Sequence, residues 1–241
     1  MKIPRFYINS PLSVNDSIDL PKEIHRHAIQ VLRLNRGEAL ILFNGTGGEY
    51  IAEIQYADKR KSQVTIQSFH DINRESNLTT RLVLSLIKPD KMDFAIQKAV
   101  ELGVNSIQPI SSDRSVVHIK KNQIEKKLNR WNNIIISACE QSGRTVIPTI
   151  TAPITLSDYL ASEPANQQII MHPEATQMIS DIHLHNEIDL LVGPEGGFTD
   201  NEVALCKQYN IQTIRFGTRI LRAETAAIAG LSLLQSYSDN L

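Results

Sequence analysis

The sequence predicts a two-domain α/β protein, with a small β-rich domain at 1–72, a linker at 73–80 and a larger domain at 81–241. Alternating apolar residues around an Asn-Gly turn indicate a β hairpin in the first part. From Arg81 onward, β-type apolar runs alternate with helix-type patterns, which is typical of a mostly parallel sheet. The length of 241 residues is sufficient for two domains with their own cores.

In the first domain, the runs 39–43 and 49–54 flank the Asn-Gly turn and form the expected hairpin. The alternating run 63–67 predicts a third strand, and 21–34 predicts a short helix before them. The polar stretch 71–80 has no periodicity, so the linker at 73–80 is expected within it.

In the second domain, several of the predicted helices have a start or stop signal. Asp90 can cap a helix that Gly103 ends, and Thr199 with Glu202 matches a capping box. The expected strands are 81–87, 106–110, 168–171, 189–192 and 211–216, and the expected helices are 90–102, 122–142, one beginning after 199, and 224–237.

The net charge of −1 hides an uneven distribution, because residues 81–150 carry +5 and residues 151–241 carry −7. A basic middle favours a polyanionic partner such as nucleic acid, although a solvated helix face explains it as well. Cys139 and Cys206 are isolated, which argues against zinc and disulfides and predicts a cytoplasmic protein without a metal. No apolar run approaches the roughly 18 residues of a membrane span.

Three loops follow predicted strands, at 171–174, 192–197 and 216–225. Their glycines allow a ligand to approach the backbone closely, and loops at adjoining strand ends form a crevice. No loop has the lysine of a triphosphate-binding motif, so a neutral or cationic adenosine-type ligand is favoured. The alternative is that these segments are only tight turns.

The order of residues in these loops resembles a known family. GPEGGF at 193–198, followed by LRAETAAIA at 221–229, is similar to the SPOUT class of RNA methyltransferases, and more closely to its RsmE family. The stretches KMDFAIQKAVELGV at 91–104 and ACEQSGR at 138–144 resemble other motifs of that family. PRFY at 4–7 and HAIQVLRL at 27–34 resemble its N-terminal PUA-like RNA-binding domain.

The resemblance implies a PUA-like β-barrel followed by a SPOUT domain with a trefoil knot, in a homodimer. It also implies that S-adenosylmethionine is the cofactor and that the product is N3-methyluridine in 16S ribosomal RNA of the small subunit. Two alternatives stay open, namely a SPOUT enzyme acting on another RNA such as transfer RNA, and a non-catalytic RNA-binding assembly factor.

The cofactor site is expected to use residues of all three loops and of the following helix. They are Met171, His172, Leu191, Val192, Gly193, Pro194, Glu195, Gly196, Gly197, Phe216, Gly217, Ile220, Leu221, Arg222, Glu224, Thr225 and Ala226.

For catalysis, Arg222 is the first candidate, because a cation near uridine would stabilise the base as it loses its N3 proton. Glu140 and Arg144 are candidates for base or RNA contact. Structural alternatives exist for these residues: Arg222 could only hold its loop in place, and Glu140 could only cap the helix or pair with Arg144. Glu224 is expected to order its loop rather than to act as a base. His172 is a less favoured general base.

Five cations are expected to contact RNA, through phosphates or beside stacked bases. They are Arg5, Arg26, Arg33, Arg36 and Lys91. For those of the front domain, the alternative is an ordinary solvated rim.

Overall fold

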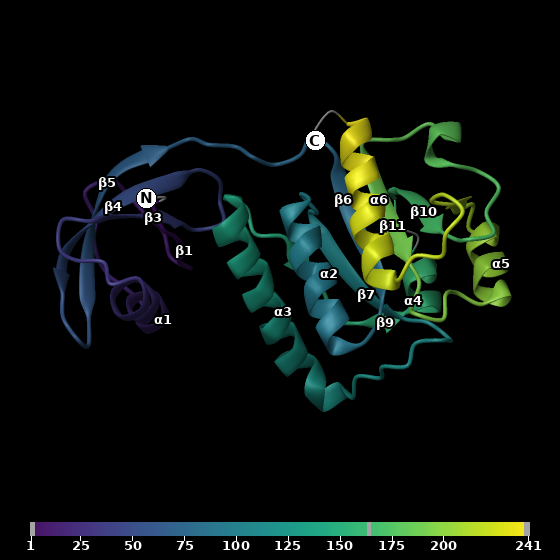
Figure 1. The fold of residues 1–241 in the computed structure, drawn as a ribbon, viewed down its shortest axis with the longest axis horizontal. Coiled ribbons are helices and arrows are strands. Elements are labelled where there is room, and N and C mark those ends of the chain that lie inside the picture. The colour runs from purple at the N-terminus through teal and green to yellow at the C-terminus, as the bar shows by residue number, and fades with distance from the viewer. Residues whose placement is uncertain (1–2, 163–164, 239–241) are drawn as a thin grey trace. The chain divides into compact units, whose positions relative to one another are not determined.

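The computed structural model describes residues 3–162 and 165–238, which form two compact units (Figure 1). The first contains Met1–Glu75 together with Cys139–Ile147, and the second contains Ser76–Ala138 and Pro148–Leu241. The boundaries expected from the sequence assign Cys139–Ile147 to the second domain. The structure instead packs this segment with the first unit.

The first unit is built on a five-stranded mixed sheet in the order β1-β3-β4-β5-β2. Its strands are β1 (Arg5–Tyr7), β2 (Ser17–Asp19), β3 (Ala39–Phe43), β4 (Glu49–Ala57) and β5 (Ser62–His70). β1 runs parallel to β3 and the other pairs are antiparallel. The hairpin β3–β4 and the third strand β5 confirm the prediction. Within the described residues the sheet is mixed, and its edge strands β1 and β2 do not pair with each other.

The helix expected over 21–34 is wrong in its extent. The structure has a single turn α1 (Lys22–His25), followed by a wider π-type turn η1 (Arg26–Val31). The chain then reverses at Arg33, whose φ of 57° is left-handed and therefore ends helical geometry.

Charged side chains hold Cys139–Ile147 within the first unit. The buried Arg5 pairs with the buried Glu49, and Arg74 approaches the same carboxylate at 3.4 Å. Arg5 Nη2 also donates to the carbonyl of Arg144 at 3.1 Å, while the side chain of Arg144 pairs with Glu75. Because a buried charge must be compensated, the loss of any one partner would leave a buried charge unpaired and weaken the attachment of this segment.

Replacing Glu49 with alanine is expected to destabilise the first unit by about 3–5 kcal/mol, because Arg5 would lose its buried partner. Denaturant unfolding of the full chain measures the loss. Glu53→Ala, which removes a half-buried carboxylate from the same strand, serves as the control. A loss no larger than that of the control would contradict the assignment.

The second unit is a seven-stranded parallel sheet in the order β12-β10-β11-β6-β7-β8, with β9 also paired to β7. Its strands are β6 (Thr79–Ser85), β7 (Ser106–Ser111), β8 (Thr149–Ile150), β9 (Ile154–Thr155), β10 (Gln167–Met171), β11 (Glu187–Val192) and β12 (Gln212–Ile214). Its helices are α2 (Pro89–Glu101), α3 (Lys121–Ser142, which ends in the first unit), α4 (Leu156–Ala161), α5 (Asp200–Gln208) and α6 (Ala223–Tyr237), with a short turn η2 (Ile179–Asp181).

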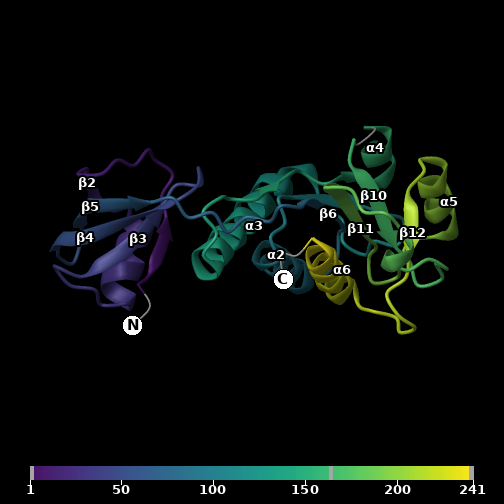
Figure 2. The same ribbon diagram turned by 90° about the horizontal axis from the view of Figure 1, so that it is seen from above.

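Helices cover both faces of this sheet, with α2 and α6 on one face and α4 and α5 on the other (Figure 2). Successive residues of β11 point to opposite faces of the sheet, so they pack alternately against the two layers of helices. Leu191 packs in the core beneath α4 and α5, whereas Leu190 lies beneath Gly230 of α6. A Cβ atom at Gly230 would lie 2.7 Å from both Leu190 Cδ2 and Met171 Sδ, so this glycine permits the close approach of helix and sheet.

The order of the last strands creates a reversal in the sheet. The chain passes from β10 to its neighbour β11 and then crosses back to β12 on the opposite side of β10. Such a reversal leaves a crevice at the carboxyl ends of the strands. The trefoil knot that the resemblance implies stays a prediction. Within the described residues, no helix combines the length and apolarity that crossing a membrane requires.

Candidate active site

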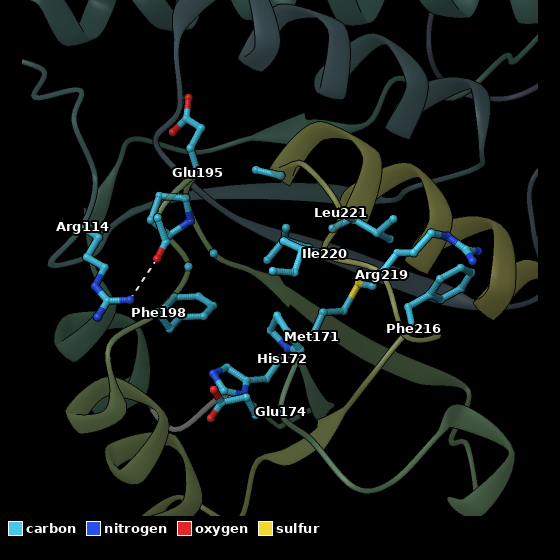
Figure 3. A pocket seen from close by; sticks show the side chains of 18 of the residues that line it. Arg114, Met171, His172, Glu174, Glu195, Phe198, Phe216, Arg219, Ile220 and Leu221 are labelled. Carbon is cyan, nitrogen blue, oxygen red and sulfur yellow. Dashed lines mark hydrogen bonds between the residues drawn. The ribbon is translucent and has the colours of Figure 1, made fainter.

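A cavity of about 570 Å³ opens at the carboxyl ends of β10, β11 and β12 (Figure 3). The sequence suggested that the two glycine loops follow neighbouring strands, but β10 lies between β11 and β12. Its loop at 172–174 therefore fills the middle of the wall. The three segments meet because Ile169 of β10 pairs with Leu190 on one side and Gln212 on the other.

Most of the residues expected at the cofactor site line this cavity. They are Met171, His172, Val192, Gly193, Pro194, Glu195, Gly196, Gly197, Phe216, Gly217, Ile220, Leu221 and Ala226. Further residues of the wall were not predicted, namely Arg114, Pro173, Glu174, Phe198, Asp200, Arg219 and Ala223. Pro173, Glu174, Arg219 and Ala223 lie within the expected loops, and Phe198 and Asp200 follow one of them closely, so only Arg114 comes from elsewhere in the sequence.

Four expected residues do not line the wall. Leu191 is fully buried in the core on the α4–α5 face, because neighbouring residues of a strand point to opposite faces. Glu224 is buried and approaches Lys91 at 3.5 Å, which fits its alternative as a loop-ordering group. Arg222 and Thr225 are exposed at the start of α6.

The glycines shape the wall in two ways. Gly197 has a φ of 68° and Gly217 a φ of 69°, and no described atom lies within 4 Å of where their Cβ atoms would be. Gly193 instead sits where a Cβ would be 3.1 Å from the backbone nitrogen of Phe198. The loop then closes with Gly197 N donating to the carbonyl of Pro194 at 2.9 Å. Backbone is thus exposed to the cavity where a side chain would block it.

The helix that follows this loop begins as predicted. Glu202 N donates to the hydroxyl of Thr199 at 3.2 Å, and Thr199 N donates to the Glu202 carboxylate at 2.8 Å. This capping box fixes where the glycine loop ends.

Apolar and charged groups share the wall of the cavity. Met171, Phe198 and Ile220 offer apolar surface, and Ile220 is 85 % exposed. In Figure 3, Glu195 lies at the top of the view and Glu174 toward the bottom. The Glu195 carboxylate accepts a hydrogen bond from the backbone N–H that precedes α2, at 3.2 Å. The wall therefore suits a ligand with a flat apolar part and a positive charge.

Glu140 and Arg144 belong to the first unit and do not line the cavity. Glu140 accepts a hydrogen bond from the backbone of Tyr7 at 3.0 Å, and burial raises the pKa of its carboxyl. Arg144 Nε donates to Glu75 at 3.1 Å. Both contacts correspond to structural roles, and the catalytic roles of these residues stay predictions.

The expected RNA-binding cations occupy different environments. Arg5 is buried in the network with Glu49, and Lys91 approaches Glu224. Arg26, Arg33 and Arg36 are exposed. A second cavity, of about 550 Å³, lies in the first unit, and its lining includes three cations, namely Arg33, Arg36 and Lys59.

The chain matches two family models, one described as an RNA methyltransferase domain at residues 74–235 and one as an RNA methyltransferase PUA domain at residues 20–67. It is 37 % identical to ribosomal RNA small subunit methyltransferase E of Buchnera aphidicola subsp. Schizaphis graminum, across 97 % of this chain and 96 % of the relative. The enzyme of the same name from Rickettsia conorii is 34 % identical over the full length of both chains.

Among solved structures, ribosomal RNA small subunit methyltransferase E from Neisseria gonorrhoeae bound to S-adenosyl methionine matches with a TM-score of 0.91. The two sequences are 38 % identical over 98 % of each chain. Sequence, fold and both domains agree over nearly the whole length, and the chain therefore belongs to the ribosomal RNA small subunit methyltransferase E family.

Proposed function

We propose that the protein methylates N3 of a specific uridine in 16S ribosomal RNA, with S-adenosylmethionine as methyl donor. The observation that carries this proposal is the cavity at the sheet reversal, whose wall contains the glycine loop of the family motif. The substrate we propose is the RNA of the small ribosomal subunit, in the cytoplasm, and the working form is a homodimer.

The residues of the cavity fit this cofactor. Gly197 and Gly217 keep backbone open to the cavity, and Met171, Phe198 and Ile220 provide apolar surface for the faces of an adenine ring. The wall has three carboxylates, at Glu174, Glu195 and Asp200, against two arginines, Arg114 and Arg219, and this excess of negative charge favours a cationic ligand over a pyrophosphate. When bound, S-adenosylmethionine supplies an activated methyl group on a positively charged sulfur.

The protein's own contribution is to position the uridine and to make its N3 a better nucleophile. Holding the reactants in line accounts for a large part of the rate in such transfers. N3 must also lose a proton, and a cation beside the base stabilises the resulting negative charge. Arg222, exposed between the wall residues Leu221 and Ala223, is the cation that we propose for this role.

The test is mass mapping of 16S ribosomal RNA from a strain that lacks the gene, with and without the restored protein. One missing methyl group on a uridine N3, returned by the wild-type gene, supports the proposal. A methyl group missing from transfer RNA would point to a different RNA substrate. A protein that binds RNA but gives no heat of S-adenosylmethionine binding in calorimetry would be a non-catalytic factor.

For the first unit, we propose that the cavity beside Arg33 and Arg36 holds RNA through phosphates. Asp58, a carboxylate of its lining, accepts hydrogen bonds from the backbone of Arg60 and Lys61, so it is already engaged. No described carboxylate forms an ion pair with Arg33, Arg36 or Lys59.

Replacing both Arg33 and Arg36 with alanine is expected to weaken RNA binding and to make it less dependent on salt. Because the double variant lacks two cations that bind phosphate, the slope of log affinity against log salt should fall by about 1.4–1.8. Cofactor affinity, measured by calorimetry, should not change. An unchanged slope would remove this cavity from the RNA-binding surface.

A further inference from the structure

Arg114 is a cation of the active-site wall that no sequence motif indicated. It projects from the turn that follows β7, and this turn is held by buried hydroxyl groups. Ser112 N donates to Ser115 Oγ at 3.1 Å, and Ser115 N donates to the carbonyl of Ser112 at 3.0 Å. Ser112 Oγ also donates to Ser85 Oγ at 3.1 Å, at the end of β6. The backbone at Arg114 is therefore firmly placed.

The same turn is tied to the start of α5. Asp113 N donates to Glu202 Oε1 at 2.8 Å, and Thr199 Oγ1 donates to Asp113 Oδ2 at 3.2 Å. Glu202 and Thr199 form the capping box that ends the glycine loop. The turn and the glycine loop thus share one set of hydrogen bonds.

The side chain of Arg114 lies against the glycine loop. Its Nη1 donates to the carbonyl of Gly196 at 3.0 Å, shown by the dashed line in Figure 3. A Cβ atom at Gly196 would lie 3.3 Å from Arg114 Cβ, so the stem covers this glycine. Holding a carbonyl requires only one neutral donor, whereas a guanidinium has five N–H groups and a full charge. Within the described residues no carboxylate pairs with Arg114.

The chain that leaves the cavity wall is also basic and exposed. Residues 114–121 contain three Lys or Arg residues and one histidine, and no acidic residue. Arg114, His118, Lys120 and Lys121 are all exposed, and Val116 is 66 % exposed. Positive charge therefore continues from the cavity outward, on the same segment as Arg114. Phosphates are the groups that such a series of cations binds best.

We propose that Arg114 is a positioning residue with two contacts. One N–H group holds the Gly196 carbonyl, and the remaining ones bind a phosphate of the RNA strand whose uridine enters the cavity. The segment 116–121 continues that path for the flanking nucleotides. This inference rests on the proposed function, because it takes RNA to be the substrate. The arrangement links RNA engagement directly to the loop that shapes the cofactor site.

Three variants of the full-length protein separate the two contacts. Arg114→Gln keeps an N–H donor without the charge, Arg114→Lys keeps the charge, and Arg114→Met keeps only the length of the stem. Affinity for unmodified 16S ribosomal RNA is measured at several salt concentrations, and affinity for S-adenosylmethionine by calorimetry. Lys207→Gln, which removes an exposed charge from the last turn of α5, is the matched control.

We expect the glutamine and methionine variants to lower the salt slope by about 0.7–0.9, the value of one phosphate contact, while the lysine variant and the control keep it. Cofactor affinity should fall most in the methionine variant. A slope unchanged in the glutamine and methionine variants, or lowered equally in the control, overturns the inference. Wild-type protein that binds this RNA but leaves it unmethylated would instead overturn the proposed function.

Discussion

Replacing Gly197 with valine is expected to abolish measurable S-adenosylmethionine binding while the fold stays intact. Gly197 has a φ of 68°, and a β-branched residue is strongly disfavoured in this left-handed region. Its Cβ atom would also enter open space in the cavity wall, since no described atom lies within 4 Å of it. The substitution thus strains the loop and also fills part of the cavity in which we propose that S-adenosylmethionine binds. Isothermal calorimetry measures the binding.

The matched control is Gly37→Val in the first unit. Gly37 has a φ of 86° and equally open surroundings, so the backbone strain is comparable, but it does not line the cavity. Cofactor affinity should be unchanged in this control. Full affinity in Gly197→Val would place the cofactor elsewhere.

Replacing Arg222 with alanine is expected to lower turnover by about 10²–10³-fold, the effect of losing one well-placed donor to developing negative charge. Arg222 precedes α6, and its backbone carbonyl accepts from Ala226 N at 2.8 Å, a contact that alanine retains. Its side chain makes no capping hydrogen bond. A loss of turnover would therefore not follow from an unravelled helix start. Arg222→Lys should recover little, because an ammonium lacks the planar fork of a guanidinium.

The pH dependence separates catalysis from structure at this position. If Arg222 eases deprotonation of N3, the deficit of the alanine variant should shrink as the pH rises and the base ionises unaided. Arg215→Ala removes an exposed arginine of the same loop that does not line the cavity, and it should leave turnover unchanged. A deficit that is constant with pH, or that appears wholly in cofactor affinity, would make Arg222 a structural residue.

Local signals allowed much of the fold to be predicted. The capping box at Thr199 and the alternation on either side of the Asn-Gly turn are encoded within a few residues, so β3, β4 and α5 were expected. The edge strands β1 and β2 have three residues each, too few for a period to be visible. The helical segment expected at 21–34 ends early, at Val31, because Arg33 adopts a left-handed conformation that its residue type rarely takes.

The lining of the cavity was predictable where it comes from consecutive residues of a motif, and not where it comes from a segment distant in sequence. Loops next to a glycine motif line the cavity, but Leu191 points the other way because strand residues alternate. Arg114 reaches Gly196 across 82 positions of sequence, from a turn with no glycine motif of its own. Only the pairing of β6 with both β7 and β11 brings that turn to the same edge of the sheet.

The inclusion of Cys139–Ile147 in the first unit has a consequence for synthesis and for gene design. Domains generally fold as units while the chain emerges from the ribosome. Here the N-terminal unit lacks the partners of Arg5 and Arg74 on this segment until Gly143 and Arg144 have been made, when more than half of the chain exists. Exchanging only a gene fragment that ends near residue 72 would therefore not transfer the whole unit between relatives. A chimaera should take both the N-terminal part and Cys139–Ile147 from the same parent.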